Sequence, residues 1–162
     1  MLLKEYAYQA LVMNLQIQSE QIVLLWLATS NNLGEPNVPP KELFLFKGRN
    51  KLIIANIASP KSLMNILENP NVCVTGIDIW KQKEIQCRGK SKTLSPQNKR
   101  FKKVEQQFRS LNKGKLRIQQ FIEIQITQLK EIEALSYFYY PTIEEKNQIN
   151  ASQKIHLEGL RF

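Results

Sequence analysis

Residues 53–70, IIANIASPKSLMNILENP, contain the side chains best suited to bind a phosphate group. An apolar, strand-like run leads through Ser59 and Pro60 into a helical pattern whose first turn carries Lys61 and Ser62. Pro60 suits the first helical position, and Ser59 suits the N-cap. The free first-turn N–H groups, the helix dipole, the hydroxyl and the ammonium could together hold an anion. The same residues would also make an ordinary helix start, so both interpretations stay open.

Other reactive side chains are few. The chain has one histidine, His156, and two cysteines, Cys73 and Cys87, each within a strand-like run. We expect reduced core cysteines and no metal site, because zinc sites need several His or Cys ligands. The scarcity of histidine also argues against Ser-His-Asp and Cys-His catalysis. An enzyme with this sequence would take its chemistry from a cofactor, and no residue can be named as its general acid or base.

The surplus of positive charge favours anionic partners. The chain has 23 Lys and Arg against 14 Asp and Glu, a net charge of +9. In the basic stretch 98–103, Phe101 begins a helical apolar spacing that continues through Val104, Phe108 and Leu111, so the lysines should lie on the opposite, solvated face. A charged helix face is the first interpretation and a nucleic-acid patch the second. Because the aromatic rings should face the core, we expect no specific nucleic acid and only weak, salt-sensitive attraction.

The length of 162 residues suits one domain with a substantial core. No stretch approaches the roughly 20 apolar residues of a membrane span. The N-terminal residues lack the ordered basic, apolar and small-residue regions of a signal peptide. We therefore expect a cytoplasmic protein that does not bind membranes.

The pattern predicts short strands joined by tight turns, with helices between them and at both ends. A helical N-terminal segment covers about residues 1–20, with its helix at 3–15, and a C-terminal helix covers about 142–156, opened by a capping box of Thr142 and Glu145. Ser95 and Pro96 should begin another helix that ends near Leu111. The expected strands are 22–29, 37–46, 51–57, 71–80, 84–94, 120–126 and 129–140.

Strands joined this tightly must be antiparallel, and closing them removes exposed edges. A small β-barrel with flanking helices follows. Pro39 and Pro40 interrupt the second strand, so this part should be an edge, a bulge or a ligand-lined segment. On the strand 84–94, Gln86 and Arg88 should share one face with the two lysines that follow at period two.

The stretches LATSNNLGEPNVPPKELF, LIIANIASPKSLMNILENPNVCVTGID and EIQCRGKS, taken in this order, resemble the FMN-binding split-barrel family related to pyridoxamine 5′-phosphate oxidase. The C-terminal stretch SYFYYPTIEEKNQI is similar to that of the smaller members, and the resemblance covers about residues 24–149. It implies one mainly β domain over residues 1–162, a six-stranded antiparallel split β-barrel with flanking helices. It also implies a homodimer with FMN at the subunit interface.

The resemblance assigns cofactor contacts residue by residue. In NVPPK it implies flavin contacts, and in ANIASPKS it implies contacts to the ring edge and the phosphate. A glutamine of EIQC falls where the oxidase touches the flavin of the partner subunit. The implied cofactor-binding residues are Asn37, Val38, Lys41, Ala55, Asn56, Ser59, Lys61, Ser62, Asn65 and Gln86.

The implied function is hydride or electron transfer between a reduced donor and a small acceptor, with an unknown substrate. The ending KIHLEGLRF has no match to the arginine and histidine that hold pyridoxal phosphate in the oxidase, so the resemblance does not extend to vitamin B6 oxidation. Two alternatives stay open. One is a non-catalytic protein that binds flavin, or a protein that binds a deazaflavin or haem. The other is a basic barrel that binds nucleic acid.

Overall fold

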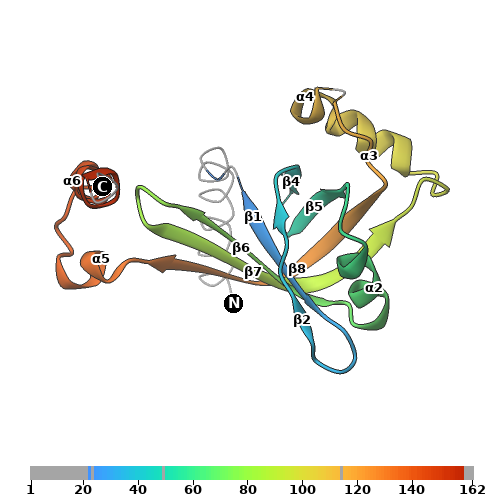
Figure 1. Ribbon diagram of the computed structural model, residues 1–162, viewed down its shortest axis with the longest axis horizontal. Coiled ribbons are helices and arrows are strands. Elements are labelled where there is room, and N and C mark those ends of the chain that lie inside the picture. The colour runs from blue at the N-terminus through green and yellow to red at the C-terminus, as the bar shows by residue number, and fades with distance from the viewer. Residues whose placement is uncertain (1–21, 23, 49, 114, 159–162) are drawn as a thin grey trace, which may run out of the picture.

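The computed structural model describes residues 22, 24–48, 50–113 and 115–158, and shows a bent antiparallel sheet with helices around it (Figure 1). The predicted helix at 3–15 lies outside these residues. The longer strands are β1 (Leu25–Ser30), β4 (Phe44–Lys47), β5 (Lys51–Asn56), β6 (Asn71–Asp78), β7 (Lys83–Leu94) and β8 (Gln120–Glu133). The helices are α2 (Pro60–Glu68), α3 (Phe101–Gln107), α4 (Arg109–Asn112), α5 (Leu135–Tyr139) and α6 (Glu145–Glu158). None of these helices has the length and apolar composition to cross a membrane.

The sheet confirms the predicted antiparallel split barrel. Its strand order is β2-β1-β6-β7-β8-β5-β4, where β2 (Pro36–Asn37) is a two-residue strand, and β3 (Pro40–Lys41) also pairs with β1. All of these pairings are antiparallel. The tight connections predicted from the turn residues thus place neighbouring strands side by side, as expected.

Residues 36–47 connect the two ends of this sheet. The first part pairs with β1, where the Leu27 amide donates to the Pro39 carbonyl at 3.1 Å. The second part pairs with β5, where the Ala55 amide donates to the Leu43 carbonyl at 2.9 Å. Because Pro39 and Pro40 have no N–H to donate, the pairing with β1 is interrupted between β2 and β3. The segment changes partner only after Lys41, which still pairs with Leu25 of β1. The predicted interruption is confirmed, and the barrel splits just after Lys41, where the segment changes partner from β1 to β5.

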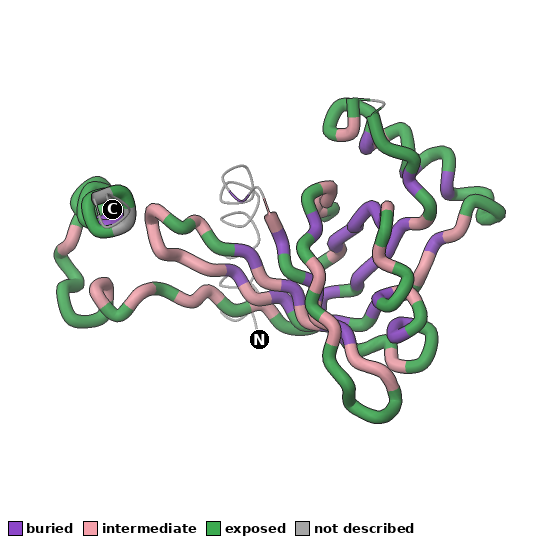
Figure 2. The backbone as a smooth tube through the Cα atoms, viewed as in Figure 1, coloured by how far each residue is buried: buried purple, intermediate pink, exposed green. Residues whose placement is uncertain are grey.

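Two apolar clusters fill the fold, one on each face of the sheet. Inside the barrel, the β1, β5, β6, β7 and β8 side chains pack with Ile66 of α2. On the outer face of β5 and β8, a second cluster packs under α3 and includes Phe101, Phe108 and Phe121. In Figure 2 the buried segments concentrate in this region, whereas the far ends of β6, β7 and β8 and helices α5 and α6 are mostly half-buried or exposed. The site described below lies in the well-buried half.

The basic helix begins later than predicted. Ser95 and Pro96 do not open it; residues 96–100 form turns, and α3 starts at Phe101. The Phe101 and Phe121 rings lie 5.1 Å apart, so burial of this aromatic residue fixes the helix start more strongly than the local capping signal. The helical stretch is also divided at Phe108 into α3 and α4.

The predicted strand 129–140 is wrong in its second half. β8 continues without a break to Glu133, and Leu135–Tyr139 forms the helix α5. The last β7–β8 pair is Lys83 with Glu133, so no β7 residue remains to pair with the aromatic residues beyond. The final helix begins at Glu145, three residues after Thr142, so the predicted capping box does not form at its start.

Candidate functional site

A buried lysine stands at the point where the barrel splits. Lys41 is only 5% exposed, and its Nζ donates to Asn56 Oδ1 at 3.0 Å and to Ser59 Oγ at 2.6 Å. Pairing of Pro40–Lys41 with β1 brings this side chain to the end of β5 and the start of α2. In the described part of the chain no carboxylate forms an ion pair with it, and burial lowers its pKa from 10.5 to about 8.

Asn56, the last residue of β5, leaves a second donor without a partner. Its side chain is fully buried, and its Nδ2 has no hydrogen-bond partner among the described residues. Buried polar atoms are nearly always paired, because an unpaired buried donor costs about 1–3 kcal/mol. The ammonium of Lys41 also has three hydrogens and two partners in the structure. Both groups can therefore donate to an acceptor-rich ligand.

A second polar network fixes α2 against β1 and β2. Asn37 Nδ2 donates to Ser62 Oγ at 3.0 Å, and Asn65 Nδ2 donates to Thr29 Oγ1 at 3.1 Å. Thr29 Oγ1 in turn donates to the Asn37 carbonyl at 3.3 Å. Thr29, Ser62 and Asn65 are buried, so this network positions the first two turns of the helix.

The start of α2 differs from the predicted capping arrangement. Pro60 occupies the first helical position as predicted, but the Ser59 side chain makes no capping hydrogen bond. Ser59 Oγ instead accepts from Lys41. The first-turn N–H groups are thus not capped by that hydroxyl, and the exposed Lys61 lies beside them.

The predicted site residues divide into three groups. Six form the two networks just described: Asn37, Lys41, Asn56, Ser59, Ser62 and Asn65. Val38 and Lys61 are exposed next to them, and Ala55 is buried beside Asn56. Gln86 lies away from both networks on the outer face of β7, in register with Thr75 and Lys130. Sequence reasoning missed Thr29, whose signal is a hydroxyl at an inward position of a buried strand.

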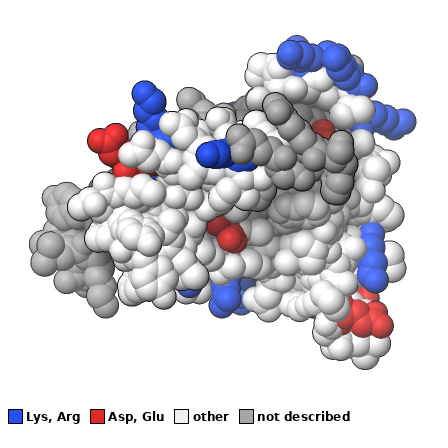
Figure 3. Space-filling model, turned by 60° about the vertical axis from the view of Figure 1, so that its left-hand side comes forward, with Lys and Arg blue, Asp and Glu red and all other residues white. Residues whose placement is uncertain are grey.

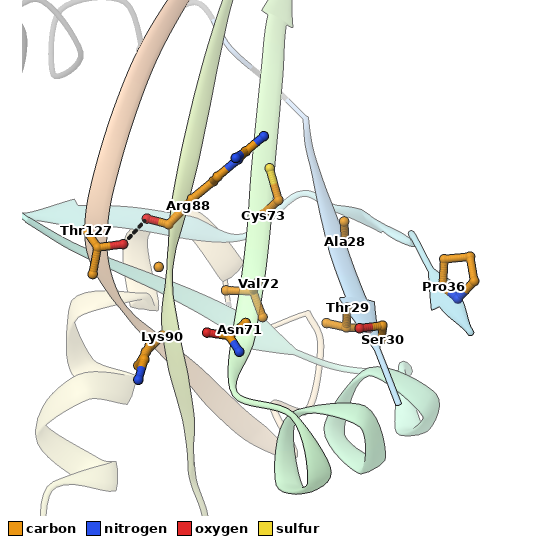
Figure 4. A pocket seen from close by; sticks show the side chains of 11 residues that line it. Ala28, Thr29, Ser30, Pro36, Asn71, Val72, Cys73, Arg88, Lys90 and Thr127 are labelled. Atoms are coloured by element: carbon orange, nitrogen blue, oxygen red, sulfur yellow. Dashed lines mark hydrogen bonds between the residues drawn. The ribbon is translucent and has the colours of Figure 1, made fainter. Parts of the chain in front are cut away.

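An open cavity of about 430 Å³ adjoins the second network on the outer face of the sheet (Figure 4). Thr29 and Pro36 line it on one side, and Cys73, Arg88 and Lys90 on the other. Cys73 and Arg88 are direct cross-strand neighbours on β6 and β7. Both cysteines are free thiols; Cys87 is buried in the core as predicted, whereas Cys73 is half-buried and lines the cavity instead. The lining of the cavity thus includes two cations, while most of its surface is apolar.

Residues 14–133 match the family model described as pyridoxamine 5′-phosphate oxidase. No curated protein matches the chain.

Several solved structures share the fold at low sequence identity. An FMN-binding protein from Syntrophomonas wolfei aligns with a TM-score of 0.66 and 15% identity, over 81% of this chain and 92% of that one. The haem storage protein HutZ from Vibrio cholerae aligns with a TM-score of 0.60 and 16% identity, over 76% and 94%. General Stress Protein 26 from Bacillus anthracis aligns with a TM-score of 0.58 and 17% identity, over 76% and 92%. At such identities these similarities show the fold alone.

Proposed function

Since the chain belongs to the pyridoxamine 5′-phosphate oxidase family, we propose that it binds FMN, with the cofactor phosphate held beside Lys41 and the start of α2. We further propose that it works as a homodimer with FMN at the subunit interface, and that it is an oxidoreductase acting on a small molecule.

The observation that carries this proposal is the pair of donors at Lys41 and Asn56. A buried ammonium without a carboxylate destabilises a protein unless something compensates its charge. The phosphate of FMN carries nearly two negative charges at neutral pH and offers several acceptor oxygens. It would compensate the ammonium and accept from the unpaired Asn56 amide.

Each chain residue would have a definite task. Lys41 and Lys61 supply positive charge, and Asn37, Ser62 and Asn65 hold the helix start in place. Val38, Ala55 and Ser59 border this position, and Gln86 would reach the flavin of the partner subunit. When bound, FMN supplies hydride and electron transfer that side chains cannot perform.

The donor set favours a phosphate-bearing cofactor over haem. Haem iron is held by His, Cys, Met or Tyr side chains, whereas the two networks offer amides, hydroxyls and an ammonium. These groups suit a phosphate rather than iron. A deazaflavin or a non-catalytic flavin role would use the same groups, and the bleaching experiment below tests the non-catalytic role.

An exposed tryptophan supports the homodimer. Trp26 on β1 is 41% exposed. It lies on the same sheet face as Gln86, because Thr75 of β6 is the cross-strand neighbour of both residues. A large aromatic ring on a sheet face gains free energy when a partner covers it. A second copy placed there would bring its Gln86 near the interface, as the proposal requires.

The decisive experiment titrates FMN and riboflavin into the apo protein. Lys41→Ala and Lys61→Ala should each weaken FMN binding by about 1.5–3 kcal/mol, or roughly 10- to 150-fold, because each removes a hydrogen bond to a charged group. The affinity for riboflavin, which lacks the phosphate, should fall much less in these variants. Lys146→Ala, which removes an exposed lysine on α6, is the matched control and should bind FMN normally. Unchanged FMN affinity in both site variants would refute the phosphate assignment.

The absorption spectrum of the purified protein, read before and after adding an electron donor, distinguishes the remaining cofactors and functions. A blue absorption band indicates flavin, and a red colour indicates haem. Anaerobic bleaching of the flavin band by a reduced nicotinamide nucleotide, followed by its return with an acceptor, would support the oxidoreductase function. A flavin band that no donor bleaches would leave a flavin carrier. Light scattering that shows a monomer would contradict the shared site.

A further inference from the structure

Positive charge is concentrated in one part of this chain and does not belong to the cofactor site. Residues 99–117 contain eight Lys and Arg and one acidic residue, Glu105, so their net charge of +7 is most of the chain's +9. Among the described residues, only one of these eight cations, Arg100, takes part in an ion pair. Figure 3 shows Lys and Arg side chains gathered at the top of the molecule, over the α3–α4 lobe.

This lobe stands beside a second set of cations on the sheet. Lys51 of β5 and Lys90 of β7 both pair with Gln125 of β8, one from each side. Together with Lys92 of β7 they line a cavity of about 240 Å³ on the outer face of the sheet. The floor of this cavity is therefore flanked by three lysines from two strands.

Contacts at two positions place the lobe next to this floor. Arg100, just before α3, binds the buried Glu123 of β8 through Nη1 at 3.1 Å and Nη2 at 2.5 Å. Lys92 Nζ lies 3.7 Å from the same carboxylate. Lys47, at the end of β4, donates to Gln107 of α3 at 3.3 Å. We call the surface formed by Lys51, Lys90, Lys92, Arg100, Lys102 and Lys103 the basic groove.

The groove has a large uncompensated charge. Glu123 is 2% exposed and pairs with Arg100 and Lys92, and none of the other four groove lysines has an ion-pair partner among the described residues. Lys102 and Lys103 are exposed on α3, because the opposite face of the helix buries Phe101 and Val104 against the sheet. An extended polyanion would meet cations on the sheet floor and again on the solvent-exposed face of α3.

We propose that the basic groove binds the phosphate backbone of nucleic acid without preference for base sequence. Lysines contact phosphates as point charges and release counterions, which gives affinity without sequence information. Phe101 and Phe108 are buried and cannot stack on bases. The apolar face of α3 is likewise buried and cannot insert into a lipid surface, which favours nucleic acid over a membrane.

The test measures the binding of a fluorescent mixed-sequence DNA duplex by anisotropy over a range of salt concentrations. The groove variant is Lys51→Gln/Lys90→Gln/Lys102→Gln, which leaves the ion pairs of Glu123 intact. The control variant, Lys130→Gln/Lys146→Gln/Lys154→Gln, removes the same charge from exposed lysines outside the groove. Thermal melting checks that both variants fold.

We expect the wild type and the control to bind with affinity that falls steeply with salt and does not change when the duplex sequence is scrambled. The groove variant should bind at least about tenfold more weakly at low salt, and its log–log salt slope should be smaller by about two to three. Equal loss in the control variant would overturn the proposal. So would retention on phosphatidylserine vesicles without duplex binding, which would indicate a membrane surface instead.

Discussion

Replacing Lys41 with methionine should change how the stability of the apo protein depends on pH. The pKa of this lysine is lowered from 10.5 to about 8 by burial. A shift of this size corresponds to about 3 kcal/mol at roughly 1.4 kcal/mol per pKa unit. Below pH 8 both the folded and the unfolded chain hold the proton. The folded protein is then destabilised by the full free energy of burying the charged ammonium. Between pH 8 and 10.5 the folded protein releases the proton first, and its stability should rise with pH.

The assay is urea unfolding of the apo wild type and of Lys41→Met at pH 7 and pH 10.5. Taking the difference between the two proteins cancels the titration of all other groups. That difference in unfolding free energy should move by about 3 kcal/mol in favour of the wild type at the higher pH. An equal difference in unfolding free energy at the two pH values would refute the reasoning. The charged Lys41 would then be as well stabilised in the folded protein as in water.

The same lysine links cofactor affinity to pH. Above its pKa of about 8 the amine of Lys41 is neutral in the apo protein, and FMN binding must then take up a proton. Its affinity should fall by roughly tenfold per pH unit, whereas the affinity of riboflavin should not. A common pH profile for both ligands would contradict a phosphate beside Lys41.

Three further predictions concern the scaffold. Gly89→Ala should destabilise the fold by about 1–3 kcal/mol in urea unfolding, because the added methyl would overlap the β8 backbone at the β-bulge. Arg100→Met should cost about 1–3 kcal/mol because it leaves the Glu123 carboxylate buried, and the added Glu123→Leu change should recover part of that loss. Lys83→Met should increase hydrogen exchange in α6 and leave hydrogen exchange in the barrel strands unchanged, because Lys83 binds Glu145 at 2.9 Å. Acidification through the range where Glu145 titrates should have the same effect in the wild type.

The order of strands and helices was predictable because its signals are local. Apolar runs and turn residues mark each strand, and Pro60 marks the first residue of α2. The errors arise where distant contacts decide. Phe101 sets the start of α3 by packing against β8, and Leu135–Tyr139 forms a helix because β7 has ended.

For the candidate site, the resemblance named residues whose cofactor contacts stay a prediction, and it did not give their geometry. The residue types of Asn37, Lys41 and Asn56 were expected from the resemblance, and they do lie in the two networks. The burial of Lys41 depends on where residues 36–47 change partner, which no local pattern specifies. Ser59 illustrates the same limit: its position suits a helix cap, yet the nearby ammonium takes its hydroxyl.

The segment 36–47, which changes partner between the two edges of the sheet, would couple the opening of the barrel to the proposed ligand; we call the join between these edges the seam. This segment hydrogen-bonds to Leu27 on one side and to Ala55 on the other, so separating the two edges requires it to detach from at least one of them. Lys41 lies in the middle of the segment and reaches Asn56 and Ser59 across the seam. A ligand bound to Lys41, Asn56 and Ser59 would therefore hold the two edges together. At a hundredfold excess over its Kd it would add about 2.7 kcal/mol to the free energy needed to separate them. The amides of Leu27 and Ala55 would then report how often the seam opens. Their hydrogen-exchange rates would fall as the ligand occupancy rises.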